Sequence, residues 1–376
     1  MSGSSRRTET PATRERISPQ SLRVCSLSTV CSLVLAALSM PAQTRFMETA
    51  LTQQAVERGF LTRPEILDFG YLDRHIREAK KSGLLVGIGP GLYALNETYS
   101  AMTLEQKHLA RCRAVADRFG DSVVISHQSS ALVHGIATWG VDLTSVNVTR
   151  RDGSRGRREA GVIHHIGKID DDDIVEVDGI PVTRPARCVW ETACIASIEA
   201  GLVTMDSALH LKLVTQDELK DAAKNFANWQ GSRSARITAR LADGRAESPG
   251  ESRSRHLFWR FHLPKPTLQH YVNTSNGLFI ARTDFAWLDY RHLGEFDGKV
   301  KYDGTFDEDG RRTVFDEKRR EDAARGELFG MSRLDWHDLS ELEFPYLLGG
   351  RFVVFRVLTC CFSFGVALMI SKGVML

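Results

Sequence analysis

The amino-acid sequence predicts a multidomain α/β (α+β) protein with an N-terminal winged helix-turn-helix, a mixed α/β bridge and a C-terminal α/β core. Three observations favour this class. The chain has 376 residues, enough for about two or three domains. Its apolar content of 42% and charged content of 26% are ordinary for a globular protein. Segments with helical spacing of apolar residues alternate with short apolar runs bounded by glycine, which is typical of mixed helices and strands.

Composition divides the chain into three predicted domains, and the segment at each end differs in composition from these domains. Residues 1–46 are a non-domain extension, interpreted either as a mis-called start upstream of Met47 or as a signal-like segment. The predicted domains are the winged helix-turn-helix over 47–96, the bridge over 97–240 and the C-terminal core over 245–342.

The C-terminal segment 345–376 is an apolar tail. Its residues 352–370 would measure roughly 28 Å as a helix, about the thickness of a bilayer core, and they include Arg356. A damaged or frame-shifted end would also give such a run, so a membrane anchor is the less favoured interpretation. Seven cysteines without C-x-x-C spacing indicate a reducing compartment and no zinc site. We expect a cytoplasmic protein.

The first domain shows the order helix, turn, basic helix and hairpin. Residues 49–58 have helical spacing, and Thr62–Glu65 is a helix start with a capping threonine and an early proline. Residues 71–81 predict a second helix, and 84–95 predict two short strands around a Gly-Pro-Gly turn. This order is that of a winged helix-turn-helix.

The second of these helices is basic on its outward side. We expect it to enter the DNA major groove while the hairpin contacts the backbone. The alternative is a small helical module for protein contacts with a solvated basic face. The expected DNA-binding residues are Arg74, Arg77, Lys80 and Lys81.

Residues 62–95 resemble the N-terminal domain of AbiEi-family antitoxins. The segment 126–135, followed by 146–149, is similar to the region after that domain in actinobacterial-type members. The resemblance implies an autorepressor of a type IV toxin–antitoxin operon, with DNA and a cognate toxin as partners and no small-molecule cofactor. The residues that carry it are Thr62, Ile66, Leu84, Gly91 and Tyr93.

The bridge predicts no chemistry of its own. Ser126, His127 and His134 suggest a nucleophile and base, but the sequence places no carboxylate to orient either histidine, which favours a packed helix. His164 and His165 alternate on a strand-like stretch and so face opposite ways. Further helices are expected over 185–200, 205–211 and 215–228.

The C-terminal core holds the residues that indicate phosphate chemistry. The segments around Asp284 and Glu295 predict two antiparallel strands joined by a polar, glycine-containing connection. Because alternate residues of a strand share a face, Asp284 would lie beside Glu295, Asp297 and Lys299. Three carboxylates on one face repel one another unless a hard cation such as Mg²⁺ lies among them. The alternative is a solvent-facing strand with ordinary surface charges.

Residues 245–342 resemble the restriction-endonuclease-like PD-(D/E)XK superfamily, and within it the very-short-patch-repair (Vsr)-like group. Asp284 matches the first acid and Glu295 the acid of the next strand. Asp297 and Lys299 complete a D-x-K pattern, and Glu251 matches the acid of the opening helix. No proline precedes Asp284, and an E-x-D pair stands where relatives have E-x-K.

This second resemblance implies a Mg²⁺-dependent endonuclease. Asp284, Glu295 and Asp297 would hold the ion, Lys299 would position the attacking water, and Glu251 would complete the site. The alternative is a catalytically inert repressor or antitoxin that uses the nuclease fold only as a binding platform.

Overall fold

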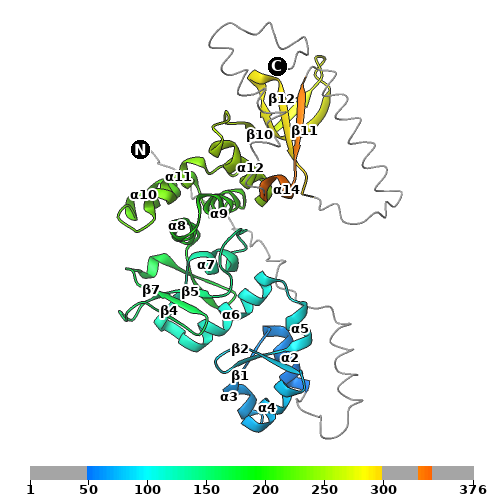
Figure 1. The fold of residues 1–376 in the computed structure, drawn as a ribbon. Helices are drawn as coiled ribbons and strands as arrows, with labels where there is room; N and C mark the ends of the chain where they lie inside the picture. The colour runs from blue at the N-terminus through cyan, green and yellow to red at the C-terminus, as the bar shows by residue number, and fades with distance from the viewer. Residues whose placement is uncertain (1–48, 299–328, 341–376) are drawn as a thin grey trace, which may run out of the picture. The chain divides into compact units, whose positions relative to one another are not determined.

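The computed structural model describes residues 49–298 and 329–340 and shows a multidomain α/β protein with mixed and antiparallel sheets (Figure 1). The chain forms two compact units, residues 1–102 and 103–376. The N-terminal extension 1–46, Lys299 and the apolar tail 345–376 lie outside the described residues. Within the described ranges, no helix is both long and apolar enough to cross a bilayer.

The first unit has the predicted order of elements. The predicted cap at Thr62 is confirmed, and it forms a capping box: Glu65 Oε2 accepts from the Thr62 N–H at 2.7 Å and the Thr62 hydroxyl accepts from the Glu65 N–H. The strands pair antiparallel in the order β1-β3-β2. The elements are α2 (Thr49–Arg58), β1 (Leu61–Thr62), α3 (Arg63–Asp68), α4 (Asp73–Lys81), β2 (Leu85–Gly89), β3 (Leu92–Leu95) and α5 (Asn96–Ala101).

The second unit begins with a six-stranded mixed sheet in the order β6-β7-β5-β4-β9-β8. Buried Cys112 and Val115 of α6 pack on Ile125, Val148 and Val182 of the sheet, which places one apolar core between helix and strands. The elements are α6 (Leu104–Phe119), β4 (Val123–Ile125), α7 (His127–Val133), β5 (Val146–Arg150), β6 (Arg157–Glu159), β7 (Val162–His165), β8 (Ile174–Val177) and β9 (Ile180–Thr183).

Helices α8 (Pro185–Ile195), α9 (Ile198–His210), α10 (Gln216–Asn225) and α11 (Ser232–Leu241) follow. The single helix expected over 185–200 is wrong. Helix α8 ends at Ile195, and Ser197 caps a new helix, α9, because its hydroxyl accepts from the Ala200 N–H at 3.1 Å. The helix expected over 205–211 is the second half of α9. Thr215 caps α10 in a capping box with Glu218.

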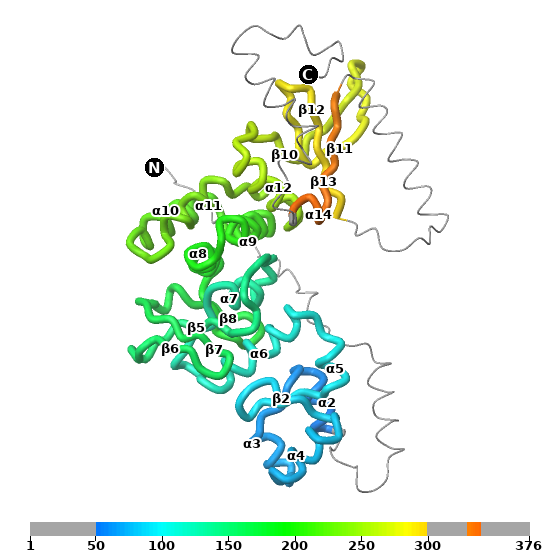
Figure 2. Tube along the Cα trace, viewed as in Figure 1, coloured from blue at the N-terminus to red at the C-terminus, as the bar shows by residue number. Residues whose placement is uncertain are grey.

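The second unit ends in a four-stranded sheet of order β10-β11-β12-β13, against which α12 (Pro249–Arg260) packs (Figure 2). The predicted hairpin is confirmed, because β11 and β12 pair antiparallel with Phe285 opposite Gly294. Phe258 of α12 meets the rings of Phe285 and Trp287 at 5.1 and 5.0 Å. The strands are β10 (Thr267–Asn273), β11 (Phe279–Trp287), β12 (His292–Phe296) and β13 (Gly330–Leu334), and α14 (Trp336–Ser340) follows.

A buried polar cluster lies where α7 meets the six-stranded sheet. The His127 ring stacks on His165 of β7 with centroids 3.8 Å apart, and Nδ1 of His127 lies 3.7 Å from Oε2 of Glu191 in α8. The expectation that no carboxylate is placed to orient His127 is therefore wrong, because α8 brings Glu191 to it from far along the chain. The Ser126 hydroxyl contacts the same nitrogen, Nδ1, at 2.9 Å, so the three groups do not form a nucleophile–base–acid relay.

Acid should destabilise the second unit through this histidine pair. Burial lowers the pKa of His127 and of His165 to about 3, whereas the unfolded chain keeps a pKa near 6.5. Between about pH 3 and pH 6.5, therefore, the two histidines are protonated in the unfolded state but not in the folded state. The contribution of the neutral histidines to the free energy of unfolding is fully present above about pH 6.5. It is lost as the pH falls from there to about 3, by at most about 1.4 kcal/mol per pH unit for each histidine.

The measurement is the free energy of unfolding in urea at a series of pH values below neutrality. His165→Phe keeps a ring against His127 and removes one titration, so its stability should fall less steeply with acid than that of the wild type. Equal slopes would contradict the assignment.

Candidate functional site

The predicted acids of the C-terminal core meet where α12 begins. The Ser248 hydroxyl caps α12 by accepting from the Glu251 N–H at 3.2 Å, which fixes Glu251 in the first turn, where it is buried. The helix comes very close to β12 here. A Cβ on Gly250 would lie 1.9 Å from Cε1 of Phe296, so glycine is needed for this approach.

Asp284 lies half-buried on β11, where the pairing with β12 ends. Its Oδ2 accepts from the Phe296 N–H at 2.8 Å, just beyond the last strand pair, Phe285 with Gly294. Continuing that register places Glu295 opposite Asp284, on the same face of the sheet. The two predicted acid-bearing strands are therefore neighbours in space.

Gln269 of β10 links Asp284 to Glu251, a contact that the sequence pattern does not reveal. Its Nε2 donates to Glu251 Oε2 at 2.8 Å and lies 3.5 Å from Asp284 Oδ1. Its Oε1 is buried and has no hydrogen-bond partner among the residues that the structure describes. Gln269 also has a φ of 51°, a left-handed conformation that costs a non-glycine residue about 1 kcal/mol or more and is found disproportionately at functional sites.

Neither carboxylate of this acid pair has an ion-pair partner among the described residues, although Glu251 accepts from the Ser248 hydroxyl at 2.8 Å and from the Glu247 N–H at 3.0 Å. Burial raises the pKa of Glu251, and the nearby Asp284 carboxylate raises it further against the hydrogen bond from the Glu247 N–H. Burial also raises the pKa of Asp284, although the Phe296 N–H opposes the shift. Two adjacent carboxyls with raised pKa values would both favour a bound cation.

Glu295 and Asp297 continue along and just beyond β12. Glu295 Oε2 lies 3.7 Å from Arg333 of β13, and the Asp297 N–H donates to the Leu334 carbonyl at 2.7 Å. Over the described ranges, no three of the acids predicted to act here bring ligand atoms within 4.8 Å of one another. Lys299 lies outside those ranges, so the predicted Mg²⁺ site formed by Asp284, Glu295 and Asp297 with Lys299 stays a prediction.

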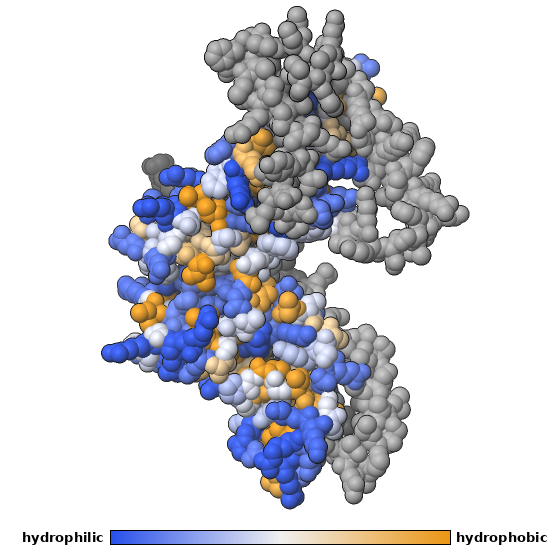
Figure 3. All heavy atoms as spheres, viewed as in Figure 1, coloured by the Kyte–Doolittle hydropathy of each residue, from blue (hydrophilic) through white to orange (hydrophobic). Residues whose placement is uncertain are grey.

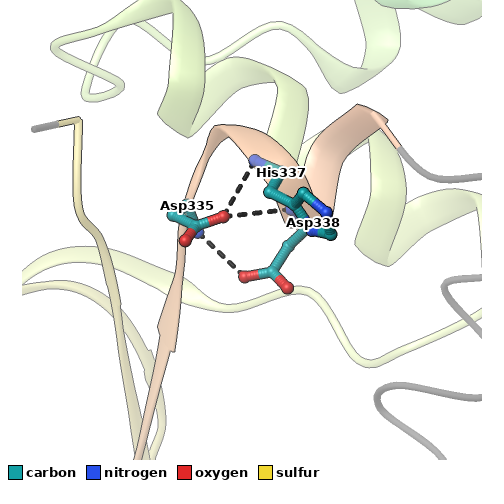
Figure 4. Close-up of side chains that lie close together, drawn as sticks. All are labelled: Asp335, His337 and Asp338. Atoms are coloured by element: carbon teal, nitrogen blue, oxygen red, sulfur yellow. Dashed lines mark hydrogen bonds between the residues drawn. The ribbon is translucent and has the colours of Figure 1, made fainter. Parts of the chain in front are cut away.

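One group in the described part of the chain does meet that distance: Asp335, His337 and Asp338 (Figure 4). Asp335 Oδ1 accepts from the N–H groups of His337 and Asp338 at 2.8 and 3.1 Å. Asp338 Oδ2 in turn accepts from the Asp335 N–H at 2.9 Å. These carboxylates cap α14, and we assign them no metal.

Helix α4 of the first unit has the two faces that the sequence predicts. Ile76 and Ala79 are buried in the core of this unit. Exposed hydrophilic side chains cover much of the visible surface of the unit (Figure 3). The four expected DNA-binding residues, which we call the α4 basic face, are all exposed: Arg74, Arg77, Lys80 and Lys81.

Comparison with known proteins finds mycobacterial relatives. No protein-family model matches the chain. The chain is similar to Uncharacterized protein Rv2248 and Uncharacterized protein MT2308 of Mycobacterium tuberculosis, each 30% identical over 220 residues that span 58% of this chain and 75% of the relative. A solved structure, the crystal structure of RV2827C protein from Mycobacterium tuberculosis, has 12% identity and a TM-score of 0.34 over 67% of this chain and 91% of that chain.

Without a divalent metal, Asp284→Asn should stabilise the second unit. It removes a charge beside Glu251 while its amide oxygen can still accept from the Phe296 N–H. We expect a gain of about 0.5–1 kcal/mol in the free energy of unfolding at neutral pH. The gain should shrink in acid, because both carboxyls have raised folded pKa values and protonation removes the same repulsion.

Urea unfolding in EDTA measures this difference. The matched control Asp289→Asn removes an exposed charge from the same β11–β12 connection and should change stability by less than about 0.5 kcal/mol. A destabilised Asp284→Asn would show that the two carboxylates do not repel.

Proposed function

This chain belongs to the same family as the mycobacterial proteins Rv2248 and MT2308, and we propose that it is a DNA-binding protein whose C-terminal site hydrolyses phosphodiester bonds with Mg²⁺. The observation that carries the proposal is the convergence of Glu251 and Asp284 on one amide, that of Gln269. The resemblance of the first unit to AbiEi antitoxins supports the further proposal of a cytoplasmic transcriptional regulator with a cognate toxin.

The residues at this site fit a hard divalent cation. Carboxylate and amide oxygens are the ligands that Mg²⁺ prefers. Glu251 and Asp284 supply two carboxylates whose pKa values are raised by burial, and the buried Gln269 Oε1 lacks a hydrogen-bond partner among the described residues. Bound there, Mg²⁺ would neutralise the acids, lower the pKa of a bound water and hold a phosphate oxygen.

Each side chain then has a separable role. Glu251 and Asp284 would hold the ion, with Glu295 on the neighbouring strand and Asp297 just beyond its end. Gln269 fixes the spacing of the first two carboxylates through its Nε2. The Phe296 N–H fixes the rotamer of Asp284. Lys299, which the sequence predicts on the same strand face as Glu295 and Asp297, would orient the attacking water and offset charge on the phosphate.

A catalytically inert repressor or antitoxin is the second candidate, and one observation favours it. The Glu295 carboxylate lies 3.7 Å from the cation Arg333, which would compete with a metal ion for this carboxylate. In this alternative the C-terminal sheet is a binding platform, and the α4 basic face alone accounts for DNA binding.

A nicking assay separates the two candidates. Supercoiled plasmid should be nicked by the wild type in the presence of Mg²⁺, and Asp284→Asn should lower the rate by a factor of at least about 100, because one metal ligand and its charge are lost. Asp289→Asn, the exposed neighbour, should nick at the wild-type rate. Equal rates for wild type and Asp284→Asn would support the inert alternative.

The α4 basic face should contribute phosphate contacts to DNA binding. The double variant Arg77→Gln, Lys81→Gln removes two exposed cations, so the slope of log K against log salt should become shallower by about 1.8 if both contact phosphates. Fluorescence anisotropy over a salt series measures the slope. Lys220→Gln, Lys224→Gln makes the same charge change on α10, where both lysines are exposed and paired with aspartates, and should leave the slope unchanged. Equal effects of the two variants would contradict a specific role for α4.

A further inference from the structure

A small pocket lies at the far end of α12 from the acids. It has a volume of about 100 Å³ and lies between α9, α11, the end of α12 and the connection to β10. Its lining is mostly apolar, and it includes Leu202, Phe258 and Pro264. Leu202 and Phe258 belong to the buried core, so these walls are fixed by packing.

The walls of the pocket are preformed. Trp287 of β11 donates its indole N–H to the Pro264 carbonyl at 2.7 Å, which ties the connection to the sheet. Phe258 is held edge-on between Phe285 and Trp287. A pocket whose walls do not have to rearrange loses less affinity to ordering than a flexible one.

Cationic side chains give this apolar pocket a charge preference. Arg255 lines it, but its guanidinium is engaged by Asp206 and by the Leu241 carbonyl. Lys265 is exposed, and its Nζ lies 3.8 Å from Oδ2 of Asp243, a carboxylate that Arg245 already holds at 2.8 Å. Arg240 is exposed and makes no hydrogen bond or ion pair with any residue that the structure describes.

From this combination we infer that the pocket binds a small carboxylate with a compact apolar body, about the size of benzoate. The apolar body would lie against Phe258, Leu202 and Pro264, and the carboxylate would face Arg240 and Lys265 at the mouth. The volume is somewhat smaller than the ~150 Å³ engineered cavity that takes up benzene, and this pocket is open on one side, so a single ring is about the largest body that fits. A bidentate guanidinium–carboxylate pair would fix its orientation. The inference does not depend on DNA binding or cleavage.

Benzoate is the probe, titrated into the full chain by isothermal calorimetry or ligand-observed NMR. We expect a dissociation constant of about 0.1–1 mM, typical of so small a ligand. Benzyl alcohol, which keeps the ring without the charge, and acetate, which keeps the charge without the ring, should each bind at least about tenfold more weakly.

Two variants localise the binding. Arg240→Gln should weaken benzoate binding about tenfold. Arg233→Gln makes the same change two turns earlier on α11, at an exposed arginine that does not line the pocket, and should leave the affinity unchanged. Unchanged thermal melting of both variants would show that the fold is intact. Absence of benzoate binding, equal affinity for benzyl alcohol, or equal loss in the two variants would each overturn the proposal.

Discussion

The architecture of the second unit depends on the packing of α12 between two layers. One side of the helix carries Phe258 onto the four-stranded sheet. The other side is tied to α9 by the buried pair Arg255 and Asp206 and by Arg253, whose Nε donates to Glu199 at 2.6 Å. Removing one partner of a buried ion pair leaves an uncompensated charge and typically costs about 3–5 kcal/mol, so these contacts fix where the helix lies. The position of Glu251 in the site follows from them.

The same helix joins the aromatic side chains near the site. The Arg253 guanidinium lies 4.3 Å from the ring centroid of Trp139, and that ring stacks on Trp336 of α14 with centroids 5.4 Å apart. Trp336 in turn meets Phe296, whose backbone N–H holds Asp284, at 5.0 Å. A continuous set of contacts therefore runs from the loop after α7 to the carboxylate of β11. The bridge, which has no predicted chemistry, supports the geometry of the candidate site.

In the metal-free protein, burial and mutual repulsion of the Glu251 and Asp284 carboxylates destabilise the candidate site. Glu251 is buried and Asp284 is half-buried, and Nε2 of Gln269 lies between the two carboxylates. Arg282, whose charge lowers the pKa of Asp284, is paired bidentately with Glu247 at 2.8 and 2.9 Å. The buried pair His127 and His165 in the same unit avoids this electrostatic cost, because both rings stay neutral. A polar cluster that serves packing can lose its charge, whereas one that serves a cation has to keep it.

The sequence by itself determined the local features of this protein. The helix starts at Thr62 and Thr215 can be predicted because the capping threonine and its glutamate lie within one turn of each other. The β11–β12 hairpin follows from strand periodicity and a polar connection. Only the tertiary structure decided which distant groups meet. Gln269 reaches Asp284 through the pairing of β10 with β11, and Glu191 reaches His127 through the packing of α8. Periodicity reports which face a residue occupies, but the neighbour across that face depends on long-range packing, which no local pattern encodes.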